Sequence, residues 1–419
     1  EKGERDMNDV SMDKQRYLIK ASGVAAALFA GIAENGFSAS YFSYALAAFL
    51  LFLFYDLYMS RPIDRSFLPD VRSAKWLFTG IVIFYGVLLI SAFLHGTKGS
   101  VNTVLWQFNL TIPFFLMLFW RARYDIDKGF LCGMAAGALV NCIWAFVQFH
   151  ADPNVPAMAG YAQQNHLGTG INLMWPFVLY MMYSTQDTKK KVMWAVLLVL
   201  MAGALYTSKS RGAVLALSGG LILTGITLIA ALRGKFNLGL IFKGLAVIAL
   251  VTAVCAGGFL YLSHDKKTGL DPERVGGERL MMLEASWEMW NDHKLTGVGP
   301  GKWGEYYYSP KYHPKDGHEK GHTMPHDMPM LFLTEDGIFG VAAYFAFLLL
   351  TYGYLYRAIR TSQNKALASA MMLSFLIFTL HGLVDTTIIN KIPGRMYYMI
   401  LGWYAGYIAY ESYRQRRLI

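Results

Sequence analysis

The chain has 419 residues, of which 55% are apolar, 15% are aromatic and only 16% are charged. This composition excludes an ordinary set of soluble domains and favours a membrane protein. The net charge of +10 does not indicate nucleic-acid binding, because the basic residues are distributed as membrane topology requires.

Twelve segments are long and apolar enough to cross a bilayer, which takes about 20 mostly apolar residues. A polar stretch precedes the first of them, so we expect no cleaved signal peptide. The fold class predicted is an all-α polytopic membrane protein of about twelve transmembrane helices. The predicted spans are roughly 17–34, 40–58, 76–95, 101–120, 129–150, 166–183, 191–207, 211–232, 239–262, 332–356, 366–388 and 393–412.

The basic residues predict the orientation of these spans. The loops on one side, with both termini, hold 23 Lys and Arg residues, and the alternate short loops hold 5. Short cytoplasmic loops are enriched in Lys and Arg. We therefore expect both termini in the cytoplasm and the long loop 263–331 on the opposite side, with helices 1–9 before it (1–262) and helices 10–12 after it (332–419).

The long loop contains a predicted amphipathic helix, RLMMLEASWEMW, with apolar residues at helical spacing. We expect it to rest on the membrane or on the bundle. Arg279 is expected at its start beside Gly276 and Gly277, where a helix N-terminus favours an anion. The alternative is a surface arginine paired with Glu278 or Glu284.

Two cations in the short loop SKSRG, Lys209 and Arg211, depart from the charge pattern of their side. They are either solvated charges at a helix end or an anion site on the outer face. The later stretch LTGVGPGKWG has a Gly-Lys pair but not the spacing of a phosphate-binding P-loop. We interpret its glycines as turns that bring the chain close to the bundle.

Histidines crowd the end of the long loop. HEKGH, which begins at His318, matches a zinc-binding string, but prolines and glycines on both sides leave barely one helical turn. We therefore expect no metal there. His326 is different, because it directly precedes an apolar run and so should lie where the loop re-enters the membrane. A histidine in that position can act as a general base.

Other polar residues fall inside or at the ends of the predicted spans. His381 and Asp385 are four residues apart in the eleventh span and should share one helical face. They either satisfy each other as a packing pair or line a substrate groove. Arg395, near Lys391, could add positive field at the external end, and Asn165 and His166 are further candidates.

Several pieces of the sequence form one pattern: Arg279, Trp287, the glycines of 297–301, PHDMPMLFLTEDGIFG from Pro325 to Gly340, SRG from Ser210 to Gly212 and YAQQNHLG from Tyr161 to Gly168. Taken together, these pieces resemble the O-antigen ligase and O-antigen polymerase superfamily. Asp327 stands where that superfamily often has Asn.

The resemblance implies a GT-C-like membrane glycosyltransferase without metal or other cofactor. It would transfer O-antigen glycan from undecaprenyl diphosphate, the donor, to a sugar hydroxyl of lipid A core oligosaccharide, the acceptor, at the periplasmic face of the bacterial inner membrane. The expected base is His326, and Arg211 and Arg279 would bind the diphosphate because guanidinium groups match phosphate oxygens. Lys209, Asn165, His381, Asp385 and Arg395 are further candidates for binding substrate.

Three alternatives remain. A polymerase or a protein O-oligosaccharyltransferase of the same superfamily would share the carrier site and differ in the acceptor. A transporter belongs to another class. Transporters often have paired interrupted helices in corresponding positions of two halves, and this sequence does not show that pattern.

Overall fold

The computed structural model describes residues 21–33, 50, 71–231, 272–314 and 321–417. Within these ranges the chain forms helices and connecting segments, and no strand. The longer helices are α3 (Lys75–Leu94), α4 (Lys98–Asn109), α5 (Ile112–Arg123), α6 (Asp127–Ala151), α7 (Gln164–Ser184), α8 (Thr188–Thr207), α9 (Arg211–Ala231), α11 (Pro272–Asp292), α13 (Met328–Thr361), α14 (Lys365–His381) and α15 (Lys391–Arg417); η2 (Val71–Ala74), α12 (Trp303–Tyr307) and a helix over Ala21–Ala33 are shorter.

Six stretches of these helices are long and apolar enough to cross a membrane: Arg72–Leu94, Lys98–Arg123, Asp127–Ala151, Thr188–Thr207, Arg211–Ala231 and Met328–Thr361. Large apolar side chains such as Val82, Val199 and Leu349 are about 70% exposed on their outer faces. A helical membrane protein is confirmed. The count of twelve spans stays a prediction, and the predicted spans 40–58 and 239–262 lie outside the described residues.

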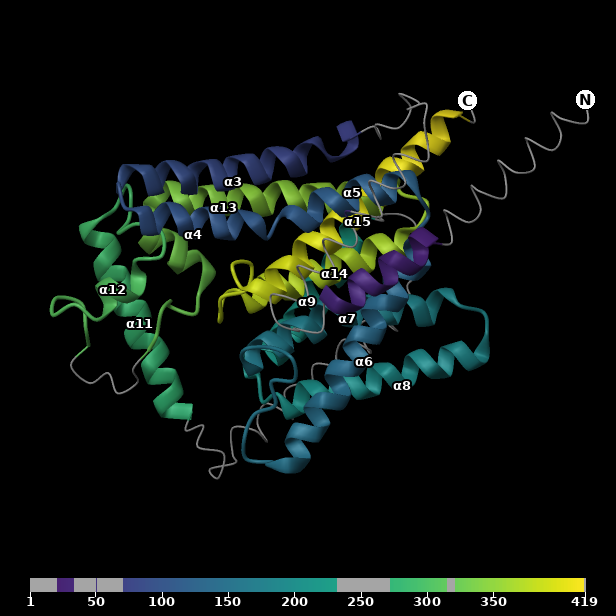
Figure 1. Ribbon diagram of the computed structural model, residues 1–419, viewed down its shortest axis with the longest axis horizontal. Helices are drawn as coiled ribbons and strands as arrows, with labels where there is room; N and C mark the ends of the chain where they lie inside the picture. The colour runs from purple at the N-terminus through teal and green to yellow at the C-terminus, as the bar shows by residue number, and fades with distance from the viewer. Residues whose placement is uncertain (1–20, 34–49, 51–70, 232–271, 315–320, 418–419) are drawn as a thin grey trace, which may run out of the picture.

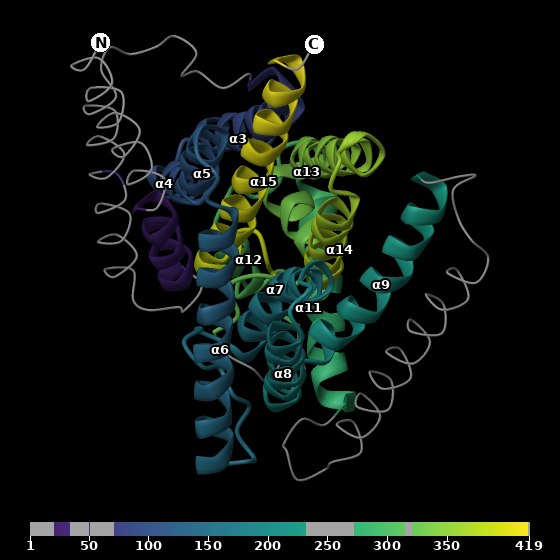
Figure 2. The same cartoon turned by 90° about the vertical axis from the view of Figure 1, so that its right-hand side faces the viewer.

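The bundle has two ends. Helices α3, α13, α5 and α15 run along the long axis, with α11 and α12 at one end and the C-terminus at the other (Figure 1). α14 packs against α7 and α9, and α8 packs against α6 and α7; Figure 2 shows α9 beside α14 on one flank. α15 begins near the turn that follows α14 and runs to the C-terminal end of the chain. The segment that follows α14 and the C-terminus therefore lie at opposite ends of the bundle.

Small residues set the close contact between α5 and α15. A Cβ on Gly402 would lie 2.1 Å from the Phe114 carbonyl oxygen, and one on Gly406 would lie 2.6 Å from that of Leu118. Glycines four residues apart allow two membrane helices to approach backbone to backbone. At the same end of the bundle the buried Arg121 pairs with Asp127 at 2.5 Å, and Trp403 donates to the same carboxylate, which ties α5, α6 and α15 together.

The glycine-rich segment after α11 docks onto a break in α13. Gly337 has φ +67° inside that helix, and the amides of Val298 and Gly299 donate to the carbonyls of Thr334 and Glu335. The Glu335 carboxylate accepts from the amides of Gly301 (2.8 Å) and Trp303 (3.1 Å). The expectation that these glycines bring the chain close to the bundle is confirmed, and a carboxylate occupies the amides that a phosphate would need.

The fourth predicted span, 101–120, lies within the candidate span Lys98–Arg123, which is divided into α4 and α5 at Leu110 and Thr111. Two details of the sequence prediction are wrong. α11 begins at Pro272, so Arg279 lies in its second turn and not at its N-terminus. α14 ends at His381, so Asp385 lies in the turn after the helix and does not share a helical face with His381.

We expect Gly297→Ala to prevent this docking. Gly297 has φ +69°, and a Cβ there would lie 2.3 Å from the Glu335 carbonyl carbon. A contact of that kind costs about 1–3 kcal/mol, so the apparent Tm in detergent should fall. Gly96→Ala is the matched control, because Gly96 has φ +63° with nothing within 4 Å of the new Cβ. Equal losses of Tm in the two variants would contradict the docking argument.

Candidate active site

The start of α13 carries His326 into contact with the turn that follows α14. His326 Nδ1 lies 2.8 Å from Asp385 Oδ1, and the side chains are 22% and 1% exposed. A carboxylate can only accept from that nitrogen, so Nδ1 holds the ring proton and Nε2 keeps a lone pair. This is the arrangement in which a buried carboxylate orients a histidine for proton transfer.

The local chain holds His326 in an unusual backbone conformation. His326 has φ +53°, a region that non-glycine residues enter rarely. Asp327 is the N-cap of α13 and accepts from the Met330 amide at 2.6 Å, while the Met328 amide donates to the Gly382 carbonyl at 2.8 Å. These bonds fix the turn. Asn and Asp are equally good N-caps, so Asp327 in place of Asn leaves the cap intact.

Asp385 lies outside the helices of the bundle, between α14 and α15. Burial raises the pKa of its carboxyl, but the hydrogen bond from His326 and the nearby His381, His326 and His166 together hold the pKa below its usual value. Its Oδ1 also accepts from the Thr386 amide at 2.8 Å. Oδ2 is buried with no hydrogen-bond partner in the described parts of the chain.

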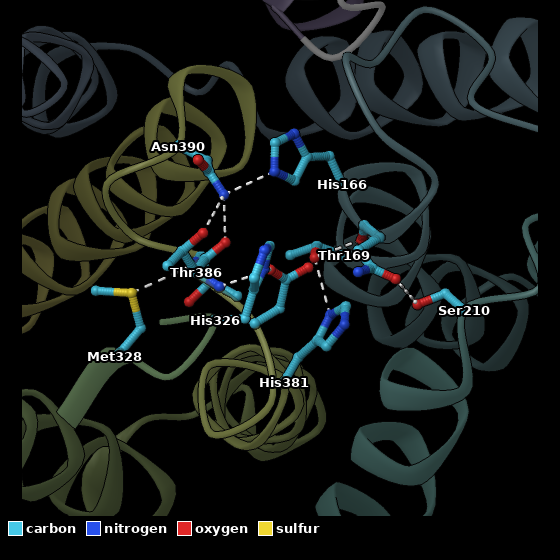
Figure 3. Close-up of polar contacts among 11 residues, drawn as sticks. His166, Thr169, Ser210, His326, Met328, His381, Thr386 and Asn390 are labelled. Atoms are coloured by element: carbon cyan, nitrogen blue, oxygen red, sulfur yellow. Dashed lines mark hydrogen bonds and ion pairs between the residues drawn. The ribbon is translucent and has the colours of Figure 1, made fainter. Parts of the chain in front are cut away.

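A second network joins α7, α9 and α14 around His381, which is 1% exposed. The Thr169 hydroxyl donates to the Asn165 carbonyl and lies 2.9 Å from His381 Nδ1. The hydroxyl therefore accepts from Nδ1–H, which leaves the His381 Nε2 lone pair without a partner among the described residues. Figure 3 shows these contacts beside the His326 ring. Ser210 Oγ donates to Asn165 Oδ1 at 2.8 Å, which ties this network to the start of α9.

A third contact fixes His166 on the other side of the same turn. The Asn390 amide nitrogen lies 2.7 Å from His166 Nε2 and also donates to the carbonyl and hydroxyl oxygens of Thr386. Since that nitrogen is a donor, His166 Nε2 accepts. Three imidazole rings thus lie around the segment 381–390 (Figure 3).

The two arginines expected to bind diphosphate approach the site from different helices. Arg211 is the first residue of α9, and a Cβ on the following Gly212 would lie 3.3 Å from His381 Nε2. Arg279, on α11, is close enough for its charge to act on His381. Both arginines are half-buried. The structure therefore brings both guanidinium-bearing residues near His381.

The other sequence candidates have different surroundings. Lys209 is 8% exposed, and its ammonium donates to the carbonyls of Pro153 (2.9 Å) and Asn154 (3.2 Å). That bonding favours a structural role in holding the loop between α6 and α7. Arg395 is buried on α15, where its charge acts on Lys391. A substrate role for either residue stays a prediction. His318 lies outside the described residues.

Sequence reasoning missed four side chains that hold the site: Thr169, Ser210, Thr386 and Asn390. Thr169 is a polar residue within an apolar span, which is a weak signal by itself. Ser210 belongs to the SRG string, whose charged residue gave the stronger signal. Thr169, Ser210 and Asn390 contact a histidine or Asn165 from a distant part of the chain, which no local pattern of residues reveals, and Thr386 accepts from Asn390.

Part of the chain that forms this site matches a known protein family. Residues 196–345 match the family model described as O-Antigen ligase, a range that includes Arg211, Arg279 and His326. No curated protein matches the chain. This match over residues 196–345 supports an O-antigen ligase or polymerase family, and the resemblance seen in the sequence to the O-antigen ligase and polymerase superfamily is confirmed.

Proposed function

We propose that this protein is an O-antigen ligase, which transfers glycan from undecaprenyl diphosphate to a sugar hydroxyl of lipid A core oligosaccharide. The observation that carries the proposal is the 2.8 Å contact between His326 Nδ1 and the buried Asp385, near two half-buried arginines. The family match supports a glycosyltransferase-like membrane enzyme. The specific ligase reaction is our proposal.

In this mechanism His326 accepts the proton of the attacking hydroxyl. Nε2 takes that proton as the acceptor oxygen forms its bond to the anomeric carbon of the donor glycan, and the bond from that carbon to the diphosphate oxygen breaks. The imidazolium that results is stabilised by the Asp385 carboxylate 2.8 Å from Nδ1. A single displacement inverts the configuration at the anomeric carbon.

The departing diphosphate gains negative charge as the glycosidic bond breaks. Arg211 and Arg279 would bind it, since a guanidinium stays ionised and meets phosphate oxygens bidentately. The lone pair of His381 Nε2 faces the start of α9 and would hold a neighbouring guanidinium in place. Charge stabilisation of this kind contributes most in a site shielded from water.

The proposed site lies on the periplasmic side of the inner membrane. α15 begins at Lys391 beside the site and ends at Arg417, so the site and the C-terminal end are at opposite ends of the bundle (Figure 1). The excess of basic residues in the loops on the C-terminal side assigns that side to the cytoplasm. A polymerase of the same superfamily would use the same donor site with a second lipid-linked glycan as the acceptor.

A transfer assay in detergent tests the proposal. With donor, lipid A core and excess chelator present, we expect wild-type transfer to continue and His326→Ala to lower kcat roughly 10²- to 10⁴-fold, because a general base is lost. Asp385→Asn should lower kcat about 10- to 100-fold, because a neutral amide oxygen replaces the charged acceptor that stabilises the His326 imidazolium. His318→Ala is the control. Abolition of transfer by chelator or by His318→Ala would show that HEKGH is a metal site and contradict this mechanism.

The two arginines should act on the donor. Arg279→Gln is expected to lower kcat/KM for the lipid-linked glycan about 10- to 100-fold through loss of a charge-assisted contact, and Arg279→Lys should recover part of it. Lys209→Gln is the neighbouring control, because the Lys209 ammonium binds loop carbonyls. It should lower the apparent Tm and leave the KM for the donor unchanged. A donor effect confined to Lys209→Gln would reverse these assignments.

The lowered pKa of Asp385 predicts how stability depends on pH. A carboxyl whose folded pKa is below its unfolded value of about 3.9 stabilises the fold above that value, and the contribution disappears as pH falls through the folded pKa. The Tm advantage of wild type over Asp385→Asn should therefore hold from pH 8 to pH 5 and shrink below about pH 4. An advantage that grows below pH 4 would contradict the direction of the shift.

A further inference from the structure

A row of aromatic and imidazole rings extends from His326 into the loop domain. The His326 and His322 ring centroids are 6.1 Å apart, and His322 is 6.4 Å from Tyr307. Tyr307 in turn is 5.5 Å from His313 and 5.1 Å from Tyr308. We call these five residues the ring row. It starts at the proposed base and ends at Tyr308 and His313.

The inner part of the row is buried, and its outer part is exposed. Tyr307 is 1% exposed and stacks on the buried Trp303 at 4.6 Å. Tyr308 is 38% exposed, and its ring lies 5.3 Å from the exposed His313. The Tyr308 hydroxyl accepts from the amides of Gly321 and His322 at 2.8 Å each. This bonding fixes the exposed ring relative to the segment that carries His326.

We propose that the exposed part of the ring row, Tyr308 and His313, binds the sugar residues of the acceptor glycan next to the attacking hydroxyl. Each pyranose ring has an apolar face of C–H groups that packs on an aromatic ring, and hydroxyls at its edge that bond to imidazole nitrogens and phenol oxygens. Tyr and His rings provide both kinds of contact. The inference rests on the proposed function, because it identifies the acceptor by its distance from the base.

The geometry of a single displacement favours binding of the acceptor, and not of the donor, by the ring row. In a single displacement the attacking hydroxyl and the leaving diphosphate lie on opposite sides of the anomeric carbon. Arg211 and Arg279 are grouped near His381 and mark the diphosphate side, whereas the ring row begins at the base. The sugars attached to the attacking hydroxyl therefore meet the exposed rings of Tyr308 and His313, in the segment after α12.

Steady-state kinetics of the full chain in detergent test this assignment. Tyr308→Leu and His313→Ala should each raise the KM for lipid A core about 3- to 10-fold, the range expected for one aromatic contact, with the KM for the donor unchanged. Tyr308→Phe keeps the ring but loses the hydroxyl that accepts from the Gly321 and His322 amides, so it should raise the acceptor KM less than Tyr308→Leu does. Tyr183→Leu is the matched control, since Tyr183 is 74% exposed near the other end of α7.

A binding measurement separates this inference from the proposed function. Water-soluble core oligosaccharide is titrated calorimetrically into wild type, Tyr308→Leu and His313→Ala, and each variant's Tm checks its fold. Weaker binding to both variants supports the ring row even if no transfer occurs, in which case only the ligase reaction fails. Absent binding to folded wild type, unchanged binding to both folded variants, or an increase in the donor KM in place of the acceptor KM would overturn the assignment.

Discussion

The docking of the glycine-rich segment onto the break in α13 is the constraint on which the site depends. α11 carries Arg279 and α13 begins beside His326, yet 46 residues separate the two side chains in the chain. The backbone bonds of Val298 and Gly299 to α13, with the bond from the Ile338 amide to the Lys294 carbonyl, fix the end of α11 against α13. A glycine with positive φ at 297 and another at 337 let the two backbones meet.

That attachment explains why two carboxylates are retained inside the bundle next to the loop. Glu335 is 5% exposed and accepts from two loop amides, so its bonding replaces water that burial removes. Asp385 has the corresponding function on the other side of the start of α13, where it accepts from His326. Glu335 fixes the loop and Asp385 orients the proposed base, and both act on the first turns of α13.

The sequence predicted a helical membrane protein correctly because apolar length is a local property. It also placed His326 correctly at the start of α13, since the change from polar loop to apolar run occurs there. The end of α14 could not be predicted, because Leu383, Val384 and Ile388 continue the apolar pattern beyond His381. The turn there depends on Asp385 bonding to His326 from a distant part of the chain, and on Met328 bonding to Gly382. The contacts of Thr169 and Asn390 with histidines are likewise tertiary.

Helix direction adds to the charge of the arginines. α7, α9, α13 and α15 all begin near the segment 381–390, at Gln164, Arg211, Met328 and Lys391. The N-terminal end of a helix carries partial positive charge, so these starts produce a field that favours anions. The same field suits an ionised Asp385 and, in the proposed reaction, a departing diphosphate. In that reaction Asp385 would stay ionised and orient His326 while the proposed base becomes positive and the leaving group becomes more negative, so the site would not need to reorganise its charges as the bond breaks.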